Sequence, residues 1–345
     1  MKKLLSIALA LCMALSLCVT TWAAENTVDV TNVTELRNAF ASTTISGKTT
    51  INIKNDLDFT GVTWDPSSFS AAAIVVIDGG TGVTLSNLTS PLIKACGVGQ
   101  AVTIKNVTID KANINGDSFA LAAFIGNADN SSNHTFENCK LTNSSVTNTS
   151  GYAGGFVGYA SAGSSDPRTI TFTNCQVLNC QIEGGNSTGG LMGHAIGNAN
   201  LSVVVNNATV KDNTITCNDD SQVKAGSLLG TVGAGSIEVS ANVSGNTVKS
   251  GDSTTGVATI TTIYGRQGDS AADLTLTGGS YDSAPLGASD TWASYGTDTP
   301  VATDEDDNYY VGSDSIAAAA NSGTTVTVIK GGAINGLQPG ATVGE

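Results

Sequence analysis

The stretch GYAGGFVGYA, residues Gly151–Ala160, decides the fold of this chain because its pattern returns along the sequence. Within it, Phe156, Val157 and Gly158 form a motif of two bulky residues followed by glycine. Equivalent glycines are spaced 32, 35, 37 and 35 residues apart: Gly126, Gly158, Gly193, Gly230 and Gly265. Self-similarity at such a period indicates a repeat architecture.

A second set of positions repeats independently and identifies strands. The first copy has Val107 and Ile109 at two-residue spacing and Ile114 after a break, and four further copies align with it. The alternation predicts a strand, and the break predicts a corner. A unit of this length cannot bury its own apolar face, whereas stacked units can. The sequence therefore predicts an all-β fold, a right-handed parallel β-helix with one repeat per turn.

A row of asparagines precedes the first apolar column in four copies: Asn106, Asn138, Asn174 and Asn207. The fifth copy has Ser240 instead. Stacked asparagines at a corner can hydrogen-bond along the axis, and asparagine tolerates turn conformations. We interpret the row as a structural ladder, with a polar binding row as the alternative.

The glycine motif is interpreted structurally as well. Gly154, Gly155 and Gly158 are expected to let the backbone bend where turns stack closely. Phe156 and Val157 are expected to form a strand, one side chain facing the core and the other an outer face or a neighbouring loop.

The chain divides into four expected segments. Residues 1–23 have the lysines, apolar run and small residues of a secretory signal peptide, cleaved after Ala23 or Ala24. Residues 24–282 form the β-helix, and a short capping helix before its repeats has Asn32 and Glu35 spaced as a capping box. We expect residues 283–312 to be an acidic irregular linker and residues 313–345 to be a C-terminal cap or small module.

Composition limits the partners and the compartment. Removing Lys2 and Lys3 changes the formal net charge from −14 to −16 and leaves 13 basic residues, which disfavours nucleic acid and anionic membranes as partners. We expect a secreted protein, extracellular or associated with the cell surface, with no membrane insertion after signal cleavage. Five of the seven cysteines remain, and Cys139 and Cys175 share a column. These two form either a reduced core pair or a disulfide between turns.

The sequence predicts no resident cofactor and no metal site. The two histidines, His134 and His194, fall in different repeat columns, with His134 aligned to Asp166 and His194 to Tyr159 and Thr231. We interpret them as single surface histidines. The acidic residues 304–307 lack the glycine and distal glutamate of a calcium loop, so weak calcium binding is only the alternative to a solvated linker.

Two groups of residues resemble a known family. The segments GGFVG (Gly154–Gly158) and GGLMG (Gly189–Gly193) resemble the GLUG motif, a repeat of secreted bacterial proteins that include adhesin-like proteins and immunoglobulin A peptidases. The NDLD turn at Asn55–Asp58, followed by Trp64 and Asp78-Gly79, resembles the opening of bacterial surface β-helix proteins.

The resemblance covers residues 33–248 and departs from the motif at Ser227 and Ile263. It implies a right-handed parallel β-helix scaffold of the adhesin-like or pectate-lyase-like type. A zinc peptidase would need an HExxH motif, which a chain with two isolated histidines lacks.

Two functions follow as hypotheses. The first is a non-catalytic, adhesin-like binding or structural protein that contacts glycans or cell-surface proteins, as a monomer or as part of a surface assembly. The second is a polysaccharide lyase or glycoside hydrolase, for which the candidate residues are Lys105, Asp110, Lys111 and Asp117. Solvated charges on an outer face are the alternative interpretation of these four residues.

Overall fold

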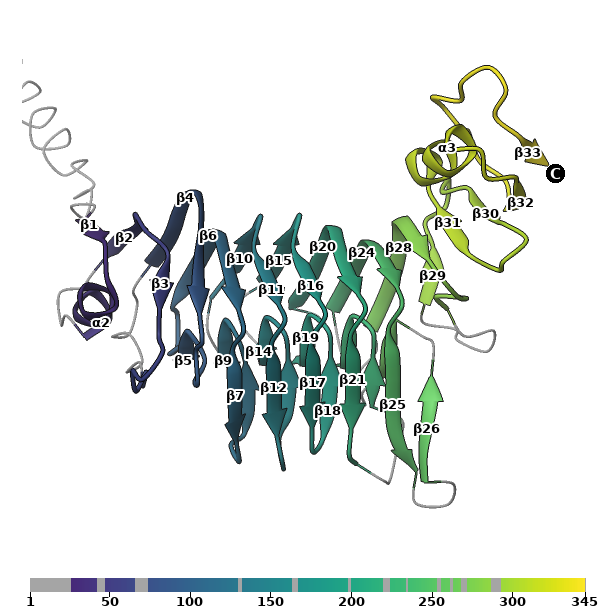
Figure 1. Ribbon diagram of the computed structural model, residues 1–345. Coiled ribbons are helices and arrows are strands. Elements are labelled where there is room, and N and C mark those ends of the chain that lie inside the picture. The colour runs from purple at the N-terminus through teal and green to yellow at the C-terminus, as the bar shows by residue number, and fades with distance from the viewer. Residues whose placement is uncertain are drawn as a thin grey trace, which may run out of the picture.

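The computed structural model describes residues 26–41, 47–65, 74–129, 132–162, 167–197, 200–219, 224–233, 235–252, 256–260, 263–267, 272–286 and 293–344. The expected signal peptide, residues 1–23, lies outside these ranges. Four sheets run along one axis and enclose a shared apolar core, which makes the central part of the chain a parallel β-solenoid (Figure 1).

The largest sheet has 17 strands, and its solenoid part runs the whole length of the solenoid. These are β1 (Asn26–Val30), β2 (Lys48–Ile53), β3 (Leu57–Asp58), β4 (Ile74–Ser86), β6 (Ala101–Asp110), β10 (His134–Glu137), β11 (Lys140–Thr142), β15 (Arg168–Thr173), β16 (Gln176–Leu178), β20 (Leu201–Lys211), β24 (Gly235–Ser244) and β28 (Ala272–Tyr281).

Three smaller sheets complete the cross-section. One contains β7 (Asn113–Gly116), β12 (Ser145–Asn148), β17 (Gln181–Gly184), β21 (Thr214–Cys217), β25 (Thr247–Asp252) and β26 (Gly256–Ile260). The next contains β8 (Ala120–Ala122), β13 (Tyr152–Gly154), β18 (Ser187–Gly189) and β22 (Ala225–Gly226). The last contains β5 (Ile93–Ala95), β9 (Ile125–Ala128), β14 (Val157–Ala162), β19 (Met192–Gly197), β23 (Leu229–Gly233) and β27 (Tyr264–Gln267).

Strand register confirms the apolar columns expected from the sequence. Leu141 of β11 pairs with Ile109 on one side and Val177 on the other. Val146 of β12 likewise pairs with Ile114 and Ile182. Because like positions pair across turns in parallel register, identical faces stack and the inward columns are buried along the whole solenoid.

The motif glycines have a different physical role from the one expected. Gly154, Gly155 and Gly158 do not have positive φ, so they are not needed for a special bend. A Cβ on Gly158 would instead lie 2.5 Å from the Gly126 carbonyl oxygen and 2.6 Å from that of Leu121. The glycines are therefore required because neighbouring backbones pass too close for any side chain.

The two bulky residues of the motif also differ from the expectation. Phe156 lies between β13 and β14, Val157 begins β14, and both are fully buried. Phe156 stacks on Phe124 of the preceding turn with a centroid distance of 4.4 Å. The corner thus turns both side chains inward, where they fill the core instead of dividing between two faces.

A short helix packs at the N-terminal end. Helix α2 (Val33–Ala41) buries Leu36, Ala39 and Phe40. The Asn32 side chain accepts a hydrogen bond from the Glu35 amide at 3.0 Å, as in a capping box. The Glu35 carboxylate accepts a hydrogen bond from the Thr31 amide at 2.7 Å. In a regular capping box this carboxylate would accept from the amide of the N-cap residue, Asn32, so the second hydrogen bond is shifted by one residue.

The described part of the segment 283–312 is not an irregular linker. It contains β29 (Ala293–Tyr295), β30 (Val301–Thr303) and β31 (Tyr309–Val311), of which β29 and β31 pair with β28. The Asp304 carboxylate organises the acidic turn between β30 and β31, because it accepts hydrogen bonds from the Asn308 amide and the Tyr310 hydroxyl at 3.0 and 2.8 Å. Local hydrogen bonding of this kind is not visible in composition.

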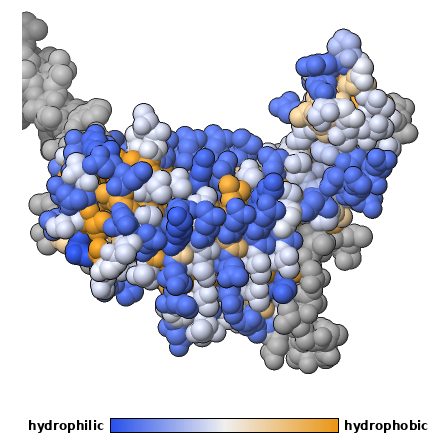
Figure 2. All heavy atoms as spheres, viewed as in Figure 1, coloured by the Kyte–Doolittle hydropathy of each residue, from blue (hydrophilic) through white to orange (hydrophobic). Residues whose placement is uncertain are grey.

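The C-terminal part continues with α3 (Ser313–Asn321), β32 (Val326–Lys330) and β33 (Val343–Gly344). It has a small apolar cluster of its own that includes Ala302, Ile316 and Val326. Figure 2 shows a mainly hydrophilic face, with apolar residues gathered towards the N-terminal end and the C-terminal part projecting from the opposite end. Neither helix of the described residues is long and apolar enough to cross a bilayer.

Candidate functional site

The four candidate catalytic residues do not form one site. The Lys105 ammonium pairs with the Asp78 carboxylate at 3.2 Å on the largest sheet. Lys111 pairs with its neighbour Asp110 at 3.9 Å, where the chain leaves β6. Asp117 follows β7 and accepts a hydrogen bond from the Ser150 hydroxyl.

Asp110 is held as a carboxylate by hydrogen-bond donors. It accepts from the Thr142 hydroxyl at 2.6 Å and from the Asn143 amide at 2.8 Å. Although partial desolvation raises the pKa of Asp110, these donors and the nearby Lys111 ammonium outweigh it, so the pKa lies below its ordinary value. A general acid needs the opposite shift, so the geometry gives Asp110 a structural role at the corner.

Both histidines are buried, so the expectation of surface histidines is wrong. His134 is 1% exposed. It pairs with Val102 of β6 on one side and with Ile170 of β15 on the other, and both of these residues are buried, so His134 occupies an inward column. Asp166, with which His134 was expected to align, lies outside the described residues. His194 is 8% exposed and pairs with Tyr159 and Thr231, as expected.

The five cysteines of the described residues are buried free thiols. Cys139 and Cys175, the candidates for a disulfide, lie in the inward column at the corner of the largest sheet. Burial raises the pKa of Cys139 to about 12 and also raises that of Cys175. Each thiol lies within hydrogen-bonding distance of a carbonyl in the preceding turn, Ile104 for Cys139 and Phe136 for Cys175.

The asparagine row forms a hydrogen-bonded ladder. Asn138 donates to Asn106 at 3.1 Å, Asn174 to Asn138 at 3.1 Å, and Asn207 to Asn174 at 3.0 Å. All four have φ between 52° and 59°. Asn106 donates in turn to the Asp78 carboxylate at 3.2 Å, which fixes the direction of the whole row.

The ladder ends where the next turn is one residue shorter. Asn206 and Asn207 of β20 lie opposite the single residue Ser240 of β24, because the register shifts between Val205 and Ala208. Ser240 is not among the residues with positive φ. The departure in the fifth copy therefore reflects the loss of the left-handed residue at this corner.

We expect Asn174→Ala to destabilise the protein by about 2 kcal/mol, from two lost ladder hydrogen bonds and a left-handed conformation that alanine disfavours. Asn174→Gly loses the same hydrogen bonds without the conformational penalty, so it should lie between the wild type and the alanine variant. Urea unfolding followed by circular dichroism measures both. Equal unfolding midpoints for all three proteins would show that the ladder contributes nothing.

A cluster of four aromatic rings covers one corner of the solenoid: Phe119, Tyr152, Tyr159 and His194, here called the aromatic cluster. Phe119 contacts Tyr152 and Tyr159 edge to face, with centroid distances of 5.2 and 4.7 Å. Tyr152 and Tyr159 stack at 5.2 Å. His194 lies 4.4 Å from Tyr152 and stacks on Tyr159 at 5.5 Å.

The glycine motif itself assembles this cluster. Tyr152 lies in β13 and Tyr159 in β14, so the tight corner between these strands brings the two rings together. Phe119 comes from the preceding turn, where its carbonyl accepts the Tyr152 amide at 3.0 Å, and His194 pairs with Tyr159 in the following turn. Phe119 is 55% exposed and the two tyrosines are partly exposed, so the cluster presents ring surface to solvent.

A groove of about 330 Å³ adjoins the cluster at Phe119. Its polar lining includes Lys94, Asn115, Ser118 and Asn127. The groove lies at the edge of two sheets, because β7 and β8 are the terminal strands of their sheets within the described residues. Asn127 pairs with Tyr159, so the groove and the aromatic cluster form one continuous surface.

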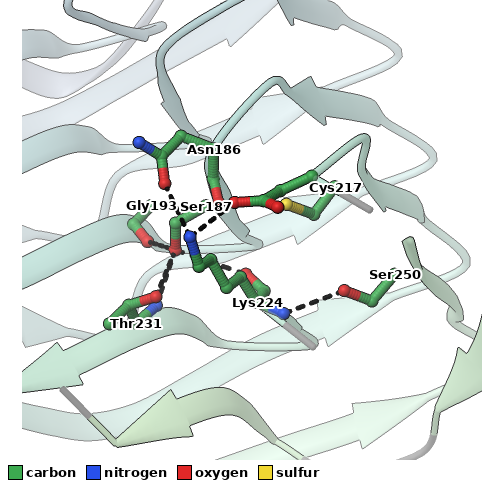
Figure 3. Close-up of polar contacts among 8 residues, drawn as sticks. Asn186, Ser187, Gly193, Cys217, Lys224, Thr231 and Ser250 are labelled. Carbon is green, nitrogen blue, oxygen red and sulfur yellow. Dashed lines mark hydrogen bonds and ion pairs between the residues drawn. The ribbon is translucent and has the colours of Figure 1, made fainter. Parts of the chain in front are cut away.

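A buried polar cluster continues the same corner into the following turns, between β18, β22 and β23, where Ser187 pairs with Tyr152 and Thr231 with His194 (Figure 3). Its Ser187 hydroxyl is fully buried and lies 2.7 Å from the Gly193 carbonyl oxygen and 2.9 Å from the Thr231 hydroxyl. It also accepts the Thr231 amide at 2.7 Å and lies 3.2 Å from the Lys224 carbonyl oxygen. With these contacts the Ser187 oxygen ties strands together and is not available as a nucleophile.

Comparison with known proteins leaves the family open. No family model and no curated protein matches this chain. Among solved structures, it is similar to the crystal structure of "a putative immunoglobulin A1 protease from Bacteroides ovatus", with 14% identity and a TM-score of 0.40, over 77% of this chain and 82% of that one. At this level of similarity neither a shared family nor a shared activity follows.

Sequence reasoning did not identify the aromatic cluster. Tyr152 and Tyr159 lie inside the stretch that decides the fold, but the glycines of this stretch indicate only a structural role, and no role was predicted for the two tyrosines themselves. The signal that was available is the alignment of Tyr159 with His194, two ring-bearing residues in one column. Phe119 carries no such signal, because it lies in the connection before β8.

Proposed function

We propose that this chain is a secreted or cell-surface β-solenoid that binds glycans at the aromatic cluster and its groove, in an adhesin-like role without catalysis. The observation that carries the proposal is the exposed ring surface of Phe119, Tyr152 and Tyr159 beside a mainly apolar groove whose lining includes a few polar side chains. A sugar ring has an apolar C–H face and a rim of hydroxyls. Aromatic rings suit the face, and amide and ammonium groups suit the rim.

Charge supports a neutral glycan over a nucleic acid. Nucleic-acid bases also stack on aromatic rings, but the formal net charge of −14 opposes a phosphate backbone. The Lys94 ammonium at the groove is paired with Asp65 at 3.5 Å, so the groove offers little net positive charge to an anion. The export of the chain rests on the expected signal peptide, which makes extracellular glycans the available ligands.

A glycan array tests the proposal, followed by calorimetry with the best neutral oligosaccharide. We expect Phe119→Ala and Tyr159→Ala each to weaken binding about tenfold, because a stacked ring contributes about 1.4 kcal/mol. Ile329→Ala is the matched control, since Ile329 is also 55% exposed but lies in β32 of the C-terminal part. An array without signal above background, or equal loss in all three variants, would contradict the proposed site.

A further inference from the structure

Three side chains with complementary chemistry meet at the polar cluster of Figure 3. The Lys224 ammonium nitrogen lies 2.5 Å from Oδ2 of Asp219 and 3.2 Å from Oδ1 of Asn186. Asn186 lies before β18 in one turn, whereas Asp219 and Lys224 lie between β21 and β22 of the next. Figure 3 shows the amide oxygen of Asn186 directed at the lysine nitrogen and the amide nitrogen directed away.

The backbone holds Lys224 and Asn186 in place. The Lys224 amide donates to the Ser250 hydroxyl at 2.8 Å, and its carbonyl accepts the Thr188 amide at 3.0 Å. The Asn186 amide donates to the Gly151 carbonyl at 3.1 Å. These hydrogen bonds to the turns on both sides fix the two backbone segments. The lysine nitrogen and the asparagine amide group therefore stay within contact distance, and little conformational entropy is lost when they react.

The site is shielded from water. The side chains of Lys224 and Asp219 are 15% and 17% exposed. The neighbouring residues Cys217 and Ala225 belong to a buried apolar cluster with Ile215 and Val248. The Asp219 carboxylate is therefore placed beside the lysine nitrogen, where it can accept a proton from that nitrogen within a poorly solvated site.

From this geometry we propose that Lys224 and Asn186 form an intramolecular isopeptide bond that links two successive turns, with Asp219 moving the proton. The ammonium gives a proton to the Asp219 carboxylate, and the freed lysine nitrogen attacks Cγ of Asn186. A bond forms between the lysine nitrogen and Cγ, and the bond from Cγ to Nδ2 breaks. Asp219 returns its proton to the departing nitrogen, which leaves as ammonia. The amide nitrogen loses the second amine hydrogen as a proton, and the ammonia takes up this proton to become ammonium. No oxidant or other reactant is needed.

Intact-mass spectrometry of the full chain after incubation at neutral pH tests this. We expect the wild type to lose about 17 Da, the mass of one ammonia. Tryptic mapping should give a branched peptide that joins Asn186 to Lys224 and is not cleaved after Lys224. The full unmodified mass, with a free peptide for each residue, would overturn the proposal and leave an ordinary ion pair.

Variants separate this reaction from other losses of ammonia, such as succinimide formation at an Asn-Gly sequence. Lys224→Arg keeps a cation beside Asp219 but should show no mass loss and a lower melting temperature. Lys211→Arg is the matched control, because Lys211 pairs with Asp212 at 3.8 Å on the surface and should leave the cross-link intact. A mass loss that persists in Lys224→Arg would refute the bond, and a cross-link that forms at the wild-type rate in Asp219→Asn would refute the role of Asp219.

Discussion

Gly158→Val is expected to destabilise the solenoid by about 3 kcal/mol or more, because it places a branched side chain between two backbones. A single Cβ at this position would already lie 2.5 Å from the Gly126 carbonyl oxygen, 2.6 Å from the Leu121 carbonyl oxygen and 2.8 Å from the Leu121 nitrogen. All three are backbone atoms of the preceding turn, so no rotamer change relieves the clash. The turns would have to separate, which weakens the ladders on both sides.

Gly331→Val is the control for this substitution. Gly331 does not have positive φ, and a Cβ there meets nothing within 4 Å, so the variant should melt within about 0.5 kcal/mol of the wild type. Gly158→Ala should fall between Gly158→Val and the wild type. Thermal and urea unfolding by circular dichroism measure all three variants. A Gly158→Val protein that melts with the wild type would show that adjacent turns are not packed backbone to backbone at this corner.

Acid is expected to destabilise the protein through His134 before its carboxylates are protonated. Burial, with a smaller effect from the nearby Arg168 charge, lowers the pKa of His134 from 6.5 to about 4. The unfolded chain therefore binds a proton between about pH 6.5 and pH 4 that the folded chain does not bind. Stability must fall as the pH is lowered through this window, by about 3 kcal/mol in total at 1.4 kcal/mol per pKa unit.

His134→Leu removes the titrating imidazole and puts an apolar side chain of similar volume into the column with Val102 and Ile170. At pH 7.5 the variant should be as stable as the wild type or more stable. At pH 5 it should be clearly the more stable of the two, because only the wild type pays for keeping a histidine neutral. Urea unfolding of both proteins from pH 7.5 to pH 4.5 measures the difference, and parallel stability curves would exclude His134 as the source of acid sensitivity.

The part of the fold that repeats could be predicted, and the part that occurs once could not. The columns through Leu141 and Val146 follow from spacing alone, because stacked turns must place equivalent residues opposite one another. The predicted alignment of His134 with Asp166 was wrong because extra residues before β15 lengthen this repeat. The partner of His134 is Ile170. The hairpin at Asp304 was not predicted because it occurs once and depends on one carboxylate and its local hydrogen-bond donors.

The candidate site depends even more on tertiary structure. The aromatic cluster joins three turns, and its rings meet because one corner is tight enough to bring Tyr152 and Tyr159 together. The contact of Lys224 with Asn186 likewise exists only across a turn boundary. A single repeat contains Tyr152 and Tyr159 but neither Phe119 nor His194, and it contains only one partner of the contact between Lys224 and Asn186, so reading the repeats one at a time cannot reveal either site.

The sequence by itself determined that the chain stacks into a parallel solenoid, since a period with alternating apolar residues can bury its faces only against its own copies. Only the tertiary structure decided why Gly158 must be glycine, where His134 lies and which aromatic rings share a surface. The physical reason is that periodicity fixes which residues are equivalent, whereas the distance between neighbouring backbones and the direction of each corner fix which residues touch.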